Sequence, residues 1–219
     1  MIKNNIKFSI AIDGSSASGK TTGSKIISKK LSFKLLSSGR LYRYLALKII
    51  KNKKKYNKKF IKNQSKKINL LKLNNKNLNG PEVTRLSSII ATKKYVRNEL
   101  KKVQLDFIKK NKKVIIEGRD IASKIMPNAD LKIFFKCSLK EKAKRRLKEY
   151  KKINKKIKLR EVEKSLKLRD FSDKNRKESP LLFVKGAVLV DTTKLTINQM
   201  RHKLISLVKE ELIKKYGNI

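Results

Sequence analysis

The residues best suited to chemistry lie in one run near the start of the chain, Gly14-Ser15-Ser16-Ala17-Ser18-Gly19-Lys20-Thr21. The run matches the pattern G-x-x-x-x-G-K-[ST] at every fixed position. Glycines let successive backbone N–H groups turn inward around a polyphosphate, and the N-terminus of a following helix adds a positive dipole. We therefore expect this loop and Thr22 to bind a nucleoside triphosphate, with Lys20 on the outer phosphates and the Thr21 hydroxyl as a Mg²⁺ ligand.

The elements that must position this loop alternate along the chain. Apolar runs predict buried strands at 8–12, 33–36, 114–116, 131–137 and 187–190. Helical spacing predicts a helix at 22–31, one that follows the second strand and ends at about residue 50, and further helices at 82–91, 96–110, 138–150 and 196–215. This alternation predicts an α/β fold with a five-stranded parallel sheet flanked by helices. Ligands of such sheets bind beyond the C-terminal ends of the strands.

Two segments differ from this pattern. Residues 51–79 are rich in Lys and Asn, and we expect a loosely packed insertion with a small strand pair near the apolar run 68–73. Residues 151–179 are charged and poor in apolar side chains, which suits a mobile flap. Between these segments, Ser138 and Glu141 have the spacing of a capping box before the helix at 138–150.

The net charge of +43 has two explanations. A nucleic-acid binder gathers Lys and Arg to displace counterions from a phosphate backbone. Codon bias instead spreads lysine over tolerant surface positions. The chain has 49 Lys against 11 Arg and no Trp, and the lysines are scattered over nearly every polar segment. This distribution favours codon bias, so we do not expect nucleic acid as a partner, although the charge should attract anionic nucleotides.

Composition also limits the class of protein. The 219 residues suit one α/β domain with small insertions, and no stretch is apolar enough for a membrane span. The single cysteine, Cys137, lies in a strand-like run and is expected to be an inert core thiol. The single histidine, His202, lies in a helical pattern and is expected at the surface. We expect a cytoplasmic, monomeric enzyme.

The few arginines are placed informatively. Arg43 follows the second predicted strand, Arg119 follows the third, and Arg169 and Arg176 lie on the charged flap. The rigid guanidinium fork binds phosphates and base edges in a bidentate manner that lysine cannot reproduce. These positions predict a strongly anionic site that holds two nucleotides.

Several further motifs accompany the phosphate loop in a fixed order. They are Ser37-Ser38-Gly39-Arg40-Leu41-Tyr42-Arg43, Val96-Arg97, Gly118-Arg119-Asp120, Ala143-Lys144-Arg145-Arg146, Arg169-Asp170 with Asp173 to Arg176, and Asp191-Thr192-Thr193. With these motifs the chain resembles the bacterial cytidylate kinases, a family of the nucleoside monophosphate kinase group. The resemblance spans nearly the whole chain.

The resemblance implies a role for each motif. Ser38, Arg97 and Asp120 would face the cytosine ring, where a carboxylate can accept a hydrogen bond from the exocyclic amino group. Arg43, Arg119 and Arg176 would hold the acceptor phosphate. Ser88, Arg169 and Asp173 would contact the sugar, and Tyr42 would pack against the nucleotide. Lys20, Arg145, Arg169 and Arg176 would be the catalytic residues that stabilise the transferred phosphoryl group.

The resemblance also implies how the chain is divided. The core of a three-layer P-loop NTPase fold would comprise about 1–37, 96–150 and 180–219, with a nucleoside monophosphate (NMP) binding insertion at about 38–95 and a helical lid at about 151–179. The chain departs from the family at Ser37, Arg40, Ser172 and Lys174. These departures leave the balance between CMP and dCMP open.

The reaction implied is in-line transfer of the γ-phosphoryl group of ATP to CMP or dCMP, assisted by Mg²⁺. It needs no general base, because the acceptor oxygen is already ionised. Two alternatives remain open at this point. One is a P-loop kinase acting on AMP, UMP or a sugar, and the other is a basic RNA-binding protein with a vestigial nucleotide site.

Overall fold

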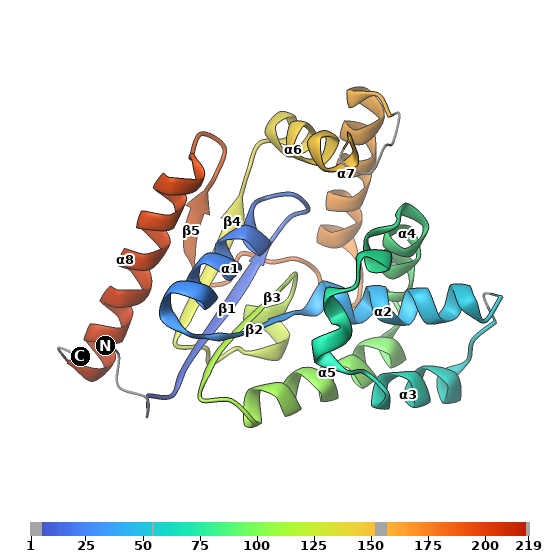
Figure 1. Ribbon diagram of the computed structural model, residues 1–219, viewed down its shortest axis with the longest axis horizontal. Helices are drawn as coiled ribbons and strands as arrows, with labels where there is room; N and C mark the ends of the chain where they lie inside the picture. The colour runs from blue at the N-terminus through green and yellow to red at the C-terminus, as the bar shows by residue number, and fades with distance from the viewer. Residues whose placement is uncertain (1–5, 54, 152–156, 218–219) are drawn as a thin grey trace. The chain divides into compact units, whose positions relative to one another are not determined.

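A five-stranded sheet carries the predicted phosphate loop in the computed structural model, which describes residues 6–53, 55–151 and 157–217 (Figure 1). The strands are β1 (Phe8–Gly14), β2 (Lys34–Ser37), β3 (Lys113–Gly118), β4 (Leu131–Lys136) and β5 (Val188–Asp191), in the order β2-β3-β1-β4-β5. β1 runs parallel to β3 and β4, and β4 runs parallel to β5. The predicted fold class, a parallel sheet flanked by helices, is confirmed.

Helices occur at the six segments where helical spacing predicts them, and also within residues 51–79 and 151–179. They are α1 (Lys20–Leu31), α2 (Ser38–Lys51), α3 (Lys58–Lys66), α4 (Pro81–Ile90), α5 (Lys94–Lys109), α6 (Leu139–Lys151), α7 (Leu159–Asn175) and α8 (Ile197–Tyr216), with short helical turns η1 (Leu70–Asn74), η2 (Lys76–Asn79) and η3 (Ile121–Ile125). The chain divides into two compact units, one of Met1–Leu35 with Lys112–Ile219 and one of Leu36–Asn111. Among the described residues, no helix combines the length and apolar character that a membrane crossing requires.

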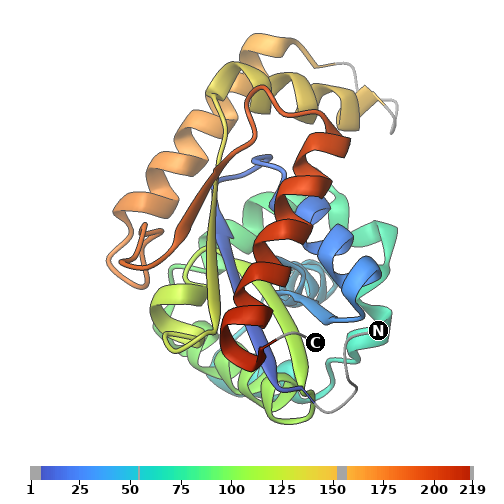
Figure 2. The same ribbon diagram turned by 90° about the vertical axis from the view of Figure 1, so that its left-hand side faces the viewer.

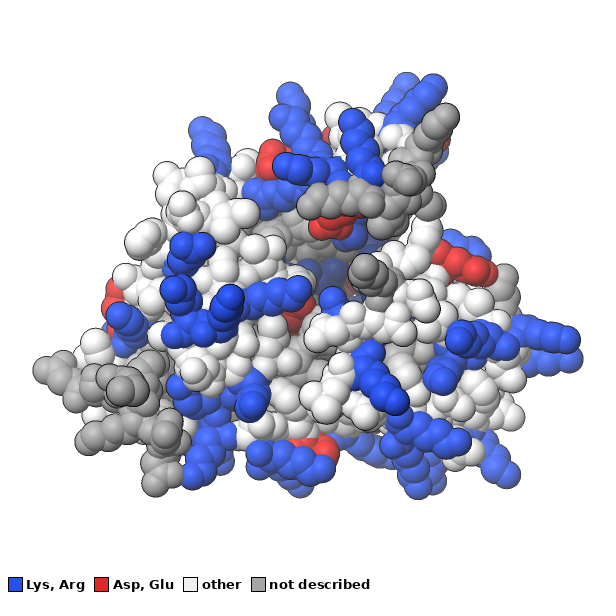
Figure 3. Space-filling model, viewed as in Figure 1, with Lys and Arg blue, Asp and Glu red and all other residues white. Residues whose placement is uncertain are grey.

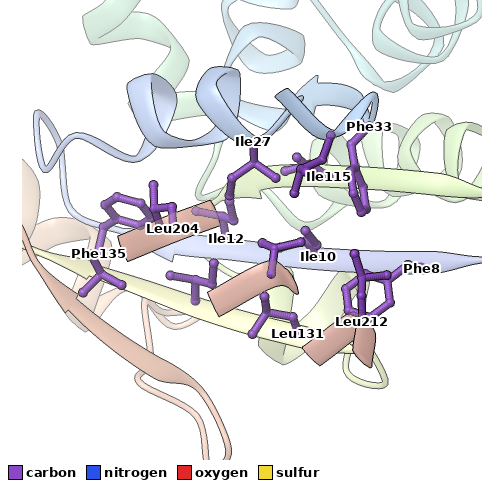
Figure 4. Packing of buried hydrophobic residues seen from close by; sticks show 14 of the residues in the cluster. Phe8, Ile10, Ile12, Ile27, Phe33, Ile115, Leu131, Phe135, Leu204 and Leu212 are labelled. Carbon is purple, nitrogen blue, oxygen red and sulfur yellow. The ribbon is translucent and has the colours of Figure 1, made fainter. Parts of the chain in front are cut away.

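The first unit has its main core between the sheet and the helices α1 and α8, which lie side by side (Figure 2). Phe8, Ile10 and Ile12 of β1 are almost wholly buried, and Ile27 of α1 and Leu204 of α8 belong to the same cluster (Figure 4). Burying each of these side chains contributes about 1.5–3 kcal/mol. This core therefore fixes β1, and with it the start of the phosphate loop.

One glycine sets how closely α1 approaches the sheet. A Cβ added to Gly23 would lie 2.6 Å from Cζ of Phe135 and 2.9 Å from Cδ1 of Leu204. Both distances are shorter than carbon atoms tolerate, so only glycine permits this packing of α1 on β4 and α8.

Most of the described part of the predicted lid, residues 151–179, is the helix α7. α7 packs on α6 through a small cluster of Ala143, Val162 and Leu166, which are all buried. Residues 152–156 lie outside the described part of the chain. The apolar contacts fix the orientation of α7 on α6, which determines where the polar residues of α7 lie.

The prediction of a strand pair within residues 51–79 is wrong. The described part of this segment contains α3, η1 and η2 and no strand. Its asparagines, read in the sequence as loop formers, cap these short helices: the Asn57 side chain accepts from Phe60 N–H, that of Asn69 from Leu71 N–H and that of Asn75 from Asn77 N–H. Asparagine is favoured at the N-caps of helices as well as in loops, so its abundance does not distinguish the two.

The capping box predicted at the start of α6 is half formed. Ser138 Oγ accepts from the backbone N–H of Glu141 at 3.3 Å. The N–H of Ser138 donates instead to Thr193 Oγ1 at 3.0 Å, and the Glu141 carboxylate accepts from Arg145 Nε at 3.0 Å. The start of α6 is therefore tied to the segment after β5, an arrangement that local spacing could not reveal.

Candidate active site

The phosphate loop follows β1 and requires glycine at both ends. Gly14 has φ 150°, and a Cβ there would lie 2.5 Å from the carbonyl oxygen of Phe135. Gly19 has φ 89°, in the left-handed region, directly before α1 begins at Lys20. Within the loop, Ser18 Oγ donates to the carbonyl of Ser15 at 3.0 Å. All loop residues expected to bind ATP, Gly14 to Thr22, therefore lie between the end of β1 and the first turn of α1, where backbone N–H groups can bind anions.

Lys20 lies against this loop and is buried. Its Nζ donates to the carbonyl of Ser15 at 2.9 Å. Burial and the neighbouring guanidinium of Arg119 hold the pKa of Lys20 well below its usual value, while the carboxylate of Glu117 acts in the opposite direction. A negative charge bound at the loop would favour the charged form of Lys20, which suits a phosphate ligand.

Glu117 is a site residue to which the sequence reading gave no role. The hydroxyl of Thr21 lies 2.9 and 2.8 Å from the two carboxylate oxygens of Glu117, which is almost wholly buried. Glu117 pairs with Ile12 in the parallel register of β1 and β3, at the C-terminal end of the sheet. The sequence signal that could have identified Glu117 is its position at the C-terminal end of a predicted strand of the sheet that carries the loop.

Asp13 organises the turn after β3. Its carboxylate accepts from the N–H groups of Ile121 at 2.9 Å and Ala122 at 2.8 Å. Burial raises the pKa of Asp13 to about 6, against the lowering effect of these two backbone bonds. These contacts fix the backbone immediately after Asp120, which is itself buried.

Arg119 joins the phosphate loop to α7. Its Nε donates to Asp173 Oδ2 at 2.8 Å and its Nη2 donates to Ser16 Oγ at 2.9 Å. Arg176 donates from Nη1 to the other oxygen of Asp173 at 3.3 Å. Burial alone would raise the pKa of Asp173, but Arg119 and Arg169 outweigh it and hold that pKa below its usual range. The structure therefore brings these four predicted site residues together beside Ser16.

Arg145 reaches the other side of the loop through Thr192. Its Nη1 donates to Thr192 Oγ1 at 3.0 Å and its Nη2 to the Thr192 carbonyl at 2.7 Å. The Thr192 hydroxyl in turn lies 2.9 Å from the carbonyl oxygen of Ser18. Arg146, one position on, instead pairs with Glu149 at 2.8 Å.

Lys142 and Asp170 form a further pair at the loop that received no role from the sequence. Lys142 Nζ bonds to Asp170 Oδ2 and lies 3.4 Å from Ser15 Oγ. The other oxygen of Asp170 accepts from Ser16 N–H at 3.2 Å. In the sequence, Lys142 and Asp170 are charged residues of helical segments, which usually face solvent. Only the packing of α7 on α6 brings this pair to the loop.

The second unit contains its own group of predicted residues. Arg97 is buried, donates to the carbonyl of Ala91 at 2.9 Å and lies with its Cζ 5.6 Å from the ring centroid of Tyr42. Tyr42 and Ser38 are also buried, on the first turns of α2. Tyr42 and Arg97 come from α2 and α5, so the packing of these two helices creates their contact.

The remaining predicted residues of this unit bond to other residues of the same unit. Arg43 Nη1 donates to Asn79 Oδ1 at 3.0 Å. Ser88 Oγ donates to the carbonyl of Thr84 at 3.3 Å, within its own helix. Arg40 donates to the carbonyl of Leu73, so this departure from the family pattern supports η1.

Lysine and arginine are scattered over the visible face of the molecule, with uncharged surface between them, rather than gathered in one patch (Figure 3). Within the described ranges, no three His, Cys, Asp or Glu side chains are placed to hold a metal ion. The Thr21 hydroxyl of the loop and the Glu117 carboxylate lie in contact and are both oxygen ligands of the kind that Mg²⁺ takes.

Comparison with known proteins identifies the family of the chain. A family model described as cytidylate kinase matches residues 10–210. The cytidylate kinase of Thermotoga petrophila is 34% identical over 219 residues, covering 94% of this chain and 98% of that protein. That of Mycoplasmoides gallisepticum is 36% identical over 220 residues, covering 95% and 96%.

A solved structure shares the fold. The crystal structure of a Thermus thermophilus protein matches with a TM-score of 0.54 and 15% identity, covering 95% of this chain and 99% of that one. At this identity the match supports the architecture alone. The match of the family model to residues 10–210, together with relatives at 34% and 36% identity over nearly their full length, shows that the chain belongs to the cytidylate kinase family.

Proposed function

We propose that the protein transfers the γ-phosphoryl group of ATP to CMP and dCMP, giving CDP and dCDP. The observation that carries the proposal is the gathering of cations on one phosphate loop. Lys20 lies against the loop, Arg119 contacts Ser16, and Arg145 reaches the loop through Thr192. Membership of the cytidylate kinase family supports the choice of acceptor.

The chemistry rests on position and charge. An oxygen of the acceptor phosphate forms a bond to the γ-phosphorus as the bond to the β-phosphate oxygen breaks, and ADP leaves. The acceptor oxygen is ionised near neutral pH, so no base has to remove a proton. Lys20, Arg145, Arg169 and Arg176 would stabilise the charge on the transferred group, in a site whose donors are already oriented.

Mg²⁺ fits the donors beside the loop. The Thr21 hydroxyl and the Glu117 carboxylate supply oxygen, which Mg²⁺ prefers, and they already lie within 2.9 Å of each other. We propose that Thr21 binds the ion directly and that Glu117 holds it, in part through water. When bound, Mg²⁺ would neutralise charge on the β- and γ-phosphates.

The nucleotide contacts inferred from the family resemblance remain proposals. In the second unit they are Ser38, Tyr42, Arg43, Ser88 and Arg97, and in the first they are Arg119, Asp120, Arg169, Asp173 and Arg176. Asp120 is buried, and the two Asp13 bonds fix the backbone directly after it, so its position at the end of β3 is well defined, which supports its role. We also propose that residues 151–179 act as a lid that excludes water during transfer.

A coupled assay tests the function directly. ADP release would be measured with CMP, dCMP, UMP and AMP as acceptors, for the protein and for Lys20→Ala. We expect turnover with CMP and dCMP to exceed that with UMP and AMP, and we expect Lys20→Ala to abolish it. A preference for AMP, or near-normal turnover by Lys20→Ala, would contradict the proposal. Lys29→Ala, on the exposed face of α1, is the matched control.

A further inference from the structure

Asp170 of α7 and Lys142 of α6 meet on the phosphate loop itself. Asp170 binds two donors there: its Oδ1 accepts from the backbone N–H of Ser16 at 3.2 Å, and its Oδ2 accepts from Lys142 Nζ. Lys142 Nζ also lies 3.4 Å from Ser15 Oγ. Both side chains are largely buried, with 8% of Lys142 and 13% of Asp170 exposed.

These two donors are the kind that phosphate uses. A loop N–H and an ammonium group, side by side before a helix N-terminus, form an anion site, and a carboxylate can occupy it in place of a phosphate. Asp170 is thus an anion supplied by the protein, bound where a phosphate group would find the same donors.

A purely structural role explains these contacts less well. α6 and α7 are already joined by the buried apolar cluster of Ala143, Val162 and Leu166. Removing two charges from water costs several kcal/mol for each ion, so a pair placed only to join helices gains little. A bond from Asp170 to the loop amide adds nothing to the contact between the helices.

The geometry points to Lys142 as a further ligand of the ATP phosphates, with Asp170 occupying their position when no nucleotide is bound. ATP binding then exchanges one anion for another: the Asp170 carboxylate leaves Ser16 N–H and Lys142, and phosphate oxygens take its place. This inference rests on the proposed function, because it requires that the loop binds ATP.

Nucleotide affinity of four variants tests the exchange. Binding of ATP to the full chain would be measured by calorimetry without an acceptor. Lys142→Met removes the ammonium and should weaken ATP binding about tenfold. Lys142→Arg keeps a cation and should restore most of the affinity. Asp170→Asn removes the competing charge and should tighten ATP binding several-fold. Lys148→Met, at an exposed position of the same helix, is the matched control and should bind ATP as the wild type does.

The outcomes separate the two roles. If Asp170 and Lys142 only join the helices, Asp170→Asn will leave ATP binding unchanged or weaken it, and either result overturns the inference. So does a Lys142→Met variant that binds ATP like Lys148→Met. If Lys142→Met does not fold, as shown by circular dichroism, the Asp170→Asn result alone decides. Wild-type protein that fails to bind ATP, or Lys20→Ala that binds it normally, would instead contradict the proposed function.

Discussion

The hydroxyl of Thr21 lies 2.9 and 2.8 Å from the two carboxylate oxygens of Glu117, so the last residue of the phosphate loop touches the end of the neighbouring strand β3. This contact joins two residues that are 96 positions apart in the chain. It places one carboxylate beside the hydroxyl that we propose as a Mg²⁺ ligand.

Glu117→Gln should weaken the response to Mg²⁺. The amide keeps the shape of the side chain and one acceptor oxygen but removes the negative charge that attracts the cation. We expect the Mg²⁺ concentration for half-maximal ATP binding to rise about tenfold and turnover to fall on the order of 100-fold. Titration of ATP affinity against Mg²⁺ measures the first effect without turnover. The exposed Glu210→Gln is the control, and equal Mg²⁺ titrations for both variants would show that Glu117 plays no part.

Arg119→Lys should lower activity although it keeps the charge. Arg119 bonds at once to Asp173 and to Ser16, and a single ammonium cannot reproduce this fork. We expect kcat/KM for CMP to fall on the order of 100-fold. Steady-state kinetics would measure the change, with Arg85→Lys on the exposed face of α4 as control. Wild-type kcat/KM in Arg119→Lys would mean that the fork has no role in the reaction.

Gly23→Ala should destabilise the fold. Its Cβ would lie 2.6 Å from Cζ of Phe135 and 2.9 Å from Cδ1 of Leu204, so α1 must move away from the sheet. We expect a loss of about 1–3 kcal/mol in the free energy of unfolding, despite the better helix propensity of alanine. Gly39→Ala is the matched control, since nothing lies within 4 Å of a Cβ there, and it should be neutral or stabilising. Thermal unfolding followed by circular dichroism compares the two, and equal midpoints would refute the close approach.

Asp13 should make stability depend on pH. Its folded pKa of about 6 lies above its ordinary value of 3.8, so between these values the folded state holds more protons than the unfolded state. The free energy of unfolding should therefore fall as pH rises through this window, by up to about 3 kcal/mol from this group. The contribution is fully present below about pH 3.8 and is lost above about pH 6.

Urea unfolding at several pH values measures this effect. Asp13→Asn cannot titrate, so its stability should decline less than that of the wild type between pH 4 and 6. Asp106→Asn, at an exposed position of α5, is the matched control. Parallel stability profiles for the wild type and Asp13→Asn would contradict the raised pKa.

Local pattern in the sequence determined most of the fold. The apolar run at 8–12 and the glycines at 14 and 19 specify a strand, a loop and a helix without help from elsewhere, because strand periodicity and left-handed backbone are local properties. The prediction of a strand pair near residues 68–73 was wrong because the local pattern there is ambiguous. Asn57, Asn69 and Asn75 can favour a loop or cap a helix, and only packing in the second unit selects between these.

What the sequence by itself determined is the loop from Gly14 to Thr21 and the alternation of strands and helices in the parallel sheet. Only the tertiary structure decided that Glu117 meets Thr21, that Arg119 joins Ser16 to Asp173, and that Lys142 and Asp170 meet on the loop. The physical reason is that each of these contacts joins side chains from elements far apart in the chain. Their distances depend on the parallel register of the sheet and on helix packing, neither of which is encoded in local spacing.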